Sequence, residues 1–88
     1  MHTTEIISAL RELIIKAAPD STQAEPVRSC RDDELLDRIV PFSSVIVLGV
    51  IIAVEDHFGI AVTREALKQA LAEGVTLRKL AKMIEALI

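Results

Sequence analysis

Two adjacent serines, Ser43 and Ser44, stand directly before the longest apolar run of the chain, Val45 to Val54. A serine at the start of a helix accepts a hydrogen bond from a backbone N–H of the first turn, and capping is its ordinary role there. A surface hydroxyl can also carry a covalent group. Elsewhere the sequence shows no nucleophile with a neighbouring base and no set of metal ligands. We therefore expect that the protein is not an enzyme.

The remaining reactive side chains have simpler interpretations. Cys30 is the single cysteine, so it cannot form an internal disulfide, and we expect an idle thiol in a loop. His57 falls near the end of the expected helix, where partial positive charge is favourable. Glu55 and Asp56 suit a solvated helix face. An ordinary charged helix face is also expected for three basic residues, Arg78, Lys79 and Lys82.

Length and composition exclude several classes of protein. The 88 residues make a single domain, 1–88, and 51% of them are hydrophobic. The net charge of −3 disfavours nucleic-acid binding, which rewards clustered Lys and Arg. The longest apolar run is about half of the ~20 residues that a membrane-spanning helix requires. Because the first residues also lack the pattern of a signal peptide, we expect a cytoplasmic protein without a membrane span.

The first half of the chain predicts one long helix and a long loop. Apolar residues recur every three or four positions from Glu5 to Ala18, as on an amphipathic helix, and Pro19 stops this helix. The stretch from Pro19 to Arg31 contains two prolines and shows no periodicity, which predicts a surface loop. A short helical piece is expected from Asp32 to Ile39, with acids in its first turn.

The stretch from Ser43 to His57 allows a strand or a helix, because β-branched residues dominate its apolar run. Its length exceeds that of an ordinary strand, and Gly59 is a plausible left-handed C-cap, so we predict a helix. Thr63 and Thr76 are expected to cap two further helices, the first ending at Gly74. The predicted fold is all-α, a small four-helix bundle with a long first loop.

The central helix begins at Ser43-Ser44-Val45 and ends on an acidic stretch and a phenylalanine, Val54-Glu55-Asp56-His57-Phe58-Gly59. With a long loop before it and two helices after it, this layout resembles the acyl carrier protein family over nearly the whole chain. In that family a serine in an Asp-Ser-Leu motif at the start of the second helix carries a 4'-phosphopantetheine arm. Counting back from Phe58 by the family's separation places the attachment on Ser44, with Ser43 as the fallback.

Several residues depart from the family's pattern. Ser43 stands where the family has aspartate, an acid that helps a phosphopantetheinyl transferase to engage the carrier, and Val45 stands at the motif leucine. Ile46 and Gly49 occupy positions that are commonly acidic and dock partner enzymes. The segment from Thr63 to Gly74 is several residues longer than the family's third helix.

The resemblance implies a carrier that holds an acyl or aminoacyl group as a thioester on the phosphopantetheine arm at Ser44. Its implied partners are a phosphopantetheinyl transferase, and loading ligases and synthases of fatty-acid, lipid or secondary-metabolite synthesis. A carrier that must visit several enzymes is expected to be a monomer.

The central helix cannot bury all of its apolar side chains. If the stripe through Val50 and Val54 faces the core, a second apolar stripe is left partly outside, and exposed apolar stripes usually mark a partner. The alternative is that the long first loop covers Ile46 and its neighbours. The docking residues that we predict are Val45, Leu48, Ile52, Glu55 and Asp56.

Two other functions compete with the carrier. A carrier-like bundle without the cofactor would act as a protein interaction module, and serine in place of the motif aspartate favours it. A helix-turn-helix DNA-binding protein would use the two helices joined at Gly74. The acidic balance and the absence of an Arg-rich face disfavour DNA binding.

Overall fold

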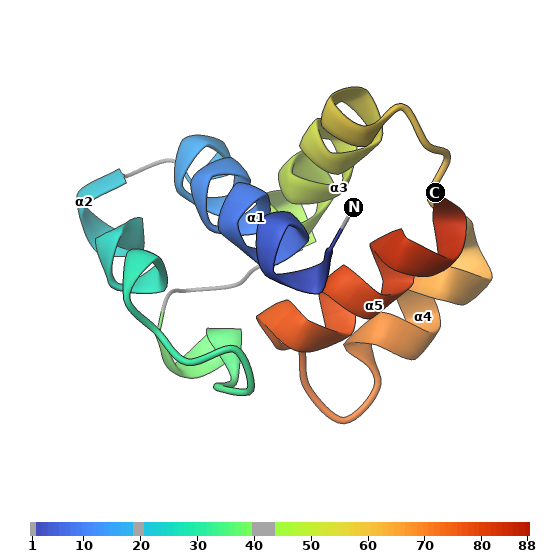
Figure 1. Ribbon diagram of the computed structural model, residues 1–88. Helices are drawn as coiled ribbons and strands as arrows, with labels where there is room; N and C mark the ends of the chain where they lie inside the picture. The colour runs from blue at the N-terminus through green and yellow to red at the C-terminus, as the bar shows by residue number, and fades with distance from the viewer. Residues whose placement is uncertain (1, 19–20, 40–43) are drawn as a thin grey trace.

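The computed structural model describes residues 2–18, 21–39 and 44–88, and the described residues form helices and turns without a strand. Four helices of at least two turns form the bundle, which confirms the expected all-α fold (Figure 1). The elements are α1 (Thr3–Ala17), α2 (Ser21–Ala24), the 3-10 turns η1 (Glu25–Arg28) and η2 (Leu36–Arg38), α3 (Ser44–Phe58), α4 (Arg64–Leu71) and α5 (Leu77–Leu87).

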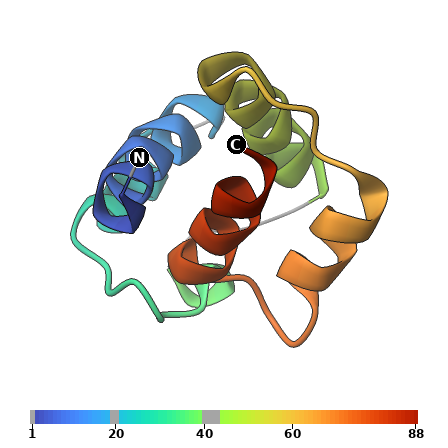
Figure 2. The same cartoon turned by 45° about the vertical axis from the view of Figure 1, so that its right-hand side comes forward.

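Helix α1 is the element around which the others pack. It contacts both α3 and α5 along its length, and α2 and η1 cover its remaining apolar side (Figures 1 and 2). Ile6, Leu10 and Ile14 follow one another at four-residue spacing, and each is 0% exposed. Fully burying such a side chain contributes roughly 1.5–3 kcal/mol, so this stripe determines which face of α1 turns inward.

The prediction of a surface loop after α1 is wrong for most of that segment. Residues 21–28 form α2 and η1, and Ala24, Val27 and Cys30 are buried. These three residues recur every third position, which matches the three residues per turn of a 3-10 helix. Pro26 does not prevent the turn, because a proline in the first positions of a helix loses no internal hydrogen bond. Pro19 and Asp20 lie outside the described residues.

The short helix expected from Asp32 to Ile39 is reduced to η2. Only Leu36–Arg38 is helical, and the residues before it form turns. Leu36 is fully buried, and its backbone N–H donates to the carbonyl of Val75 at 2.9 Å. The segment is therefore held by burial and by a distant backbone partner, not by a continuous helix.

Helix α3 confirms the choice of helix over strand. It ends on Gly59, which has a φ of 65°, and the N–H of Ile60 donates to the carbonyl of Glu55 at 3.2 Å. This is the six-to-one hydrogen bond of a Schellman C-cap, which requires a left-handed residue at the position of Gly59. Phe58 is half-buried and packs against the edge of the core.

Both predicted N-caps are confirmed. The Thr63 hydroxyl accepts from the N–H of Ala66 at 3.1 Å, and the Thr76 hydroxyl accepts from the N–H of Lys79 at 3.1 Å. Helix α4 ends at Leu71, before the expected position, because the chain turns through two left-handed residues, Glu73 and Gly74.

Replacing each of the three glycines with alanine should change the free energy of unfolding by a different amount. Gly49→Ala is expected to stabilise α3 by about 0.5–1 kcal/mol, since the new Cβ would lie an ordinary 3.6 Å from the Ala17 Cβ. Gly59→Ala should cost about 1 kcal/mol for its left-handed φ of 65° alone. Gly74→Ala should cost roughly 2 kcal/mol or more, because φ is 100° and the Cβ would meet Leu35 Cδ2 at 2.6 Å.

Urea unfolding of the three variants measures these differences in the free energy of unfolding. Equal costs at Gly59 and Gly74 would show that the contact with Leu35 is relieved without loss.

Candidate functional site

The predicted attachment residue, Ser44, is the first residue of α3. The first backbone N–H groups of a helix have no partner within the helix, and the helix dipole places partial positive charge at this end. A covalently attached phosphate is stabilised by such surroundings. The first turn of α3 contains no acidic residue that would repel the phosphate. Ser43, the fallback, lies outside the described residues.

An exposed apolar row follows Ser44 along α3. Leu48 and Ile52 lie four and eight residues beyond it, and they are 62% and 58% exposed. Asp56, one further turn along, is exposed as well. Positions four apart lie on one face of a helix, so Leu48, Ile52 and Asp56 make one continuous row, here called the α3 row, which starts one turn after position 44. The expected exposure of Leu48 and Ile52 is confirmed. Val45, also predicted to dock a partner, is the second residue of α3.

The opposite side of α3 supplies the core. Val50 and Val54 are each 1% exposed, and Ile46 and Ile51 are each 8% exposed. Ile46 is therefore buried, whereas Leu48, two residues along, is exposed.

Glu55 has an intramolecular role that the sequence analysis missed. Its carboxylate Oε2 accepts the backbone N–H of Val62 at 2.8 Å, and its carbonyl accepts the N–H of Ile60. Both bonds fasten the connection that leads to α4. The Glu55 side chain is half-buried, whereas Asp56, the next residue, is exposed and lies on the α3 row. The signal in the sequence was an acid one turn before the C-cap glycine.

Arg11 holds the segment that leads toward α3. Its Nη1 donates to the carbonyls of Val27 at 2.6 Å and Cys30 at 2.8 Å, and its Nη2 donates to Asp32 Oδ1 at 3.0 Å. The Arg11 side chain is only 19% exposed. Nothing in the spacing of α1 distinguished this arginine, because its partners lie in another element.

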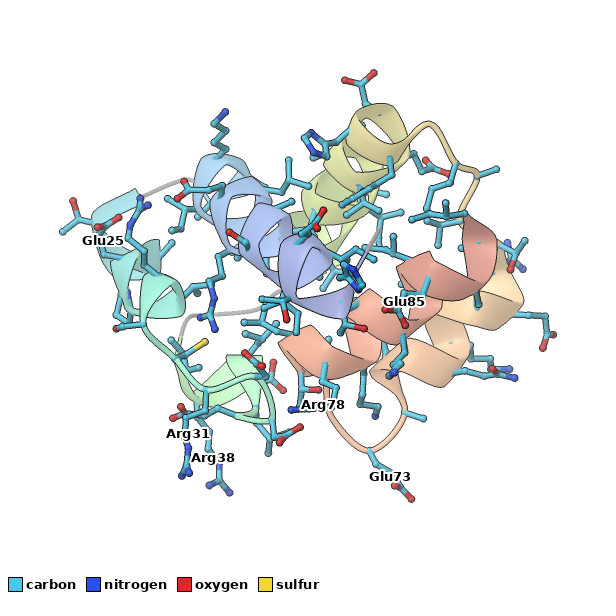
Figure 3. The ribbon with its side chains drawn as sticks, viewed as in Figure 1. Glu25, Arg31, Arg38, Glu73, Arg78 and Glu85 are labelled. Carbon is cyan, nitrogen blue, oxygen red and sulfur yellow. The ribbon has the colours of Figure 1, made fainter. Side chains whose placement is uncertain are left out.

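Asp32 extends this contact to α5. The Asp32 Oδ2 lies 3.9 Å from Arg78 Nη2. The Nε of Arg78 donates to Asp33 Oδ1 at 2.6 Å. The backbone N–H of Arg78 also donates to the carbonyl of Asp32 at 3.0 Å. Figure 3 shows Arg78 at the start of α5, beside this connection. The first connection is thus tied to α1 through Arg11 and to α5 through Arg78.

Cys30 lies in a bend after η1, and its side chain is buried. Its Sγ donates to the Val27 carbonyl at 3.4 Å, and Arg11 Nη1 donates to the Sγ at 3.5 Å. Burial raises the pKa of the Cys30 thiol, and the positive charge of Arg11 partly opposes this effect. The thiol therefore remains protonated at neutral pH and serves as an apolar core atom.

The described part of the chain shows neither a candidate metal site nor a helix that could span a membrane. No group of three or more His, Cys, Asp and Glu side chains there is arranged to hold a metal ion. None of the helices that the structure describes has the length and apolar character needed to cross a membrane.

The comparisons with known proteins found no match for this chain. No protein-family model matches the chain, and neither a curated protein nor a solved structure is significantly similar to it.

Arg11→Met tests the contact that holds the first connection. Methionine keeps the apolar stem but leaves the Cys30 carbonyl without its Arg11 donor and the Val27 carbonyl with only the weak S–H donor of Cys30, which should cost about 1–3 kcal/mol of unfolding free energy. Urea unfolding measures the loss, and thiol labelling of Cys30 should become faster as the segment opens.

Arg28→Met is the matched control, because Arg28 pairs with Glu12 and Glu25 on the surface. Exposed ion pairs contribute little, so this variant should remain close to the parent in stability. An equal loss in both variants would contradict the special role of Arg11.

Proposed function

We propose that this protein is a carrier, which holds an acyl or aminoacyl group as a thioester on a 4'-phosphopantetheine arm attached to Ser44. The observation that supports it most is the place of Ser44 as the first residue of α3, at the opposite end of the helix from Phe58 and the Gly59 cap. The order of one helix, a long connection and three further helices agrees with the carrier layout.

In the proposed modification the Ser44 hydroxyl attacks the β-phosphorus of coenzyme A. A phosphodiester forms, the bond to the nucleotide breaks, and 3',5'-ADP leaves. A phosphopantetheinyl transferase supplies the catalytic groups. The part of this chain is to present Ser44 and to surround the new phosphodiester with the N-terminal N–H groups of α3. The thiol of the arm then attacks the activated acyl group that a loading ligase presents, so that a thioester forms, the bond to the activating group breaks and that group leaves. The carrier works in the cytoplasm in fatty-acid, lipid or secondary-metabolite synthesis.

The α3 row is the proposed docking surface for the transferase and for the loading and synthase enzymes. Leu48 and Ile52 lie more than half exposed between Ser44 and Asp56, so a partner that reaches Ser44 along this face meets apolar side chains first. Burying an exposed Leu or Ile side chain favours association without any salt bridge. Docking by hydrophobic contact therefore replaces the acidic contacts that Ile46 and Gly49 do not provide.

A second candidate function is a cofactor-free interaction module. Serine at position 43, where a transferase would meet aspartate, favours it. The exposed Leu48 and Ile52 would serve such a module equally well, because hydrophobic docking does not need the arm.

The intact mass of the protein decides between the two functions. Incubation with coenzyme A and a broad-specificity transferase should add one phosphopantetheine to the parent chain and none to Ser44→Ala. A gain that persists in Ser44→Ala would move the attachment to Ser43. If there is no gain, even with the host's own transferases, the interaction module is favoured.

The docking surface is tested with Leu48→Gln and Ile52→Gln. Because both side chains are already exposed, the fold should keep its stability, while the kcat/KM of phosphopantetheinyl transfer should fall roughly tenfold in each. Ile88→Gln is the matched control, since Ile88 is also 62% exposed but lies at the end of α5. An unchanged kcat/KM in folded Leu48→Gln and Ile52→Gln proteins would overturn docking through the α3 row.

A further inference from the structure

A second concave surface lies between α4 and α5, on residues that the carrier function does not use. The two helices run side by side, and α4 packs mainly on α5 (Figures 1 and 2). The groove between them, here called the α4–α5 groove, has a volume of about 430 Å³. Ala70 and Met83 form its buried floor, and Ala66 and Leu87 form its half-buried walls.

Small side chains keep this groove hollow. Three of the residues that line it are alanines, Ala66, Ala70 and Ala86, where longer apolar side chains would fill the space. Met83 is flexible and polarisable, and such side chains adapt to different apolar surfaces. The groove is thus built to admit apolar groups from outside the chain.

The charged side chains that line the groove are all basic, and two of them pair with acids outside its lining, Arg78 with Asp33 and Lys82 with Glu85. Arg78, Lys79 and Lys82 line the groove, and none of its described lining residues is acidic, although the chain has a net charge of −3. Clustered charge of one sign steers and selects a partner of the opposite sign. The occupant must therefore combine an apolar face with negative charge.

Two of the cations are held in place. Lys79 Nζ donates to the carbonyl of Gly74 at 2.7 Å and to that of Ala72, so it is fixed over the turn between α4 and α5. Arg78 is fixed by Asp33. Lys82 is different: its side chain is 65% exposed, and its Nζ lies 3.6 Å from Glu85 on the same helix. Lys82 can therefore turn to a partner with little loss to the fold.

The shape of the groove distinguishes a helix from a small amphiphile. Small-molecule sites enclose roughly 70–90% of the ligand surface, but this groove is only partly enclosed. An amphipathic helix suits an open groove, because only its apolar face needs covering. The lining residues of α5 run from Arg78 to Leu87, roughly 14 Å along the helix axis, which matches two to three turns of a partner helix.

We propose that the α4–α5 groove binds an amphipathic helix of a partner protein, with its apolar side chains over Ala70 and Met83 and its acidic residues beside Lys82 and Arg78. This surface is separate from the α3 row. A carrier would use it to remain attached to an enzyme while Ser44 is free, but the binding does not depend on the modification.

The probe is a synthetic helical peptide of three turns, with leucines spaced three and four residues apart and glutamates along one flank. The matched peptide has lysine in place of each glutamate. Binding to the isotope-labelled full chain is followed by fluorescence anisotropy and by amide chemical shifts. The acidic peptide should shift the amides of residues 66–70 and 78–87, and the basic peptide should not.

Two variants test the role of charge. Lys82→Glu should weaken binding of the acidic peptide about fivefold to tenfold, because an attraction becomes a repulsion. Lys16→Glu makes the same change of net charge on the exposed face of α1 and should leave the affinity unchanged. Ala86→Leu, an exposed position on the groove, should also weaken binding by filling it.

Four results would overturn the proposal. They are an acidic peptide that does not bind, shifts centred on α3 in place of α4 and α5, equal losses in Lys82→Glu and Lys16→Glu, and occupation of the groove by dodecanoate but not by the acidic peptide. Because the readout is peptide binding to the unmodified chain, it is independent of whether Ser44 accepts phosphopantetheine.

Discussion

The contact of Arg11 with the first connection is the constraint on which the rest of the structure depends. The bundle has a long segment between α1 and α3, and only short helical turns organise it internally. Arg11 supplies donors to the Val27 and Cys30 carbonyls and a positive partner to Asp32. Because buried carbonyls without donors are costly, this one side chain allows Val27 to enter the core. Through Asp32 the same contact reaches Arg78 and thus the start of α5.

Helix α3 has one apolar side that is buried in the core and another that is exposed to solvent. Its inner side, with Val50 and Val54 almost fully buried, contributes to the core against α1, while Leu48 and Ile52 stay more than half exposed. A helix that only had to fold would carry polar residues on that outer face. The exposure of Leu48 and Ile52 is therefore a feature for which stability offers no explanation, and the proposed docking would account for it.

Charge is distributed unevenly over the molecule, although the net value is small. Acidic side chains at Asp32 and Asp33 neutralise Arg78 from one side, and Glu85 approaches both Thr3 and Lys82 on the side of α5 that faces α1 (Figure 3). The charged side chains that line the α4–α5 groove itself are all basic. The two surfaces proposed for partners thus differ in chemistry, one apolar with a terminal acid and the other apolar with basic edges, so they suit different partners.

The sequence by itself determined the local features. Thr63 and Thr76 cap their helices, and Gly59 ends α3, because each of these interactions joins residues only a few positions apart. The sequence pattern already placed Leu48 and Ile52 outside, but only the tertiary structure decided that Ile46 is covered, since a helix that is apolar nearly all round does not fix how far its neighbours cover it. The tertiary structure alone also paired Arg11 with Asp32, 21 residues away, and Arg78 with Asp33, 45 residues away. Such partners depend on how the helices pack, and no local spacing encodes them.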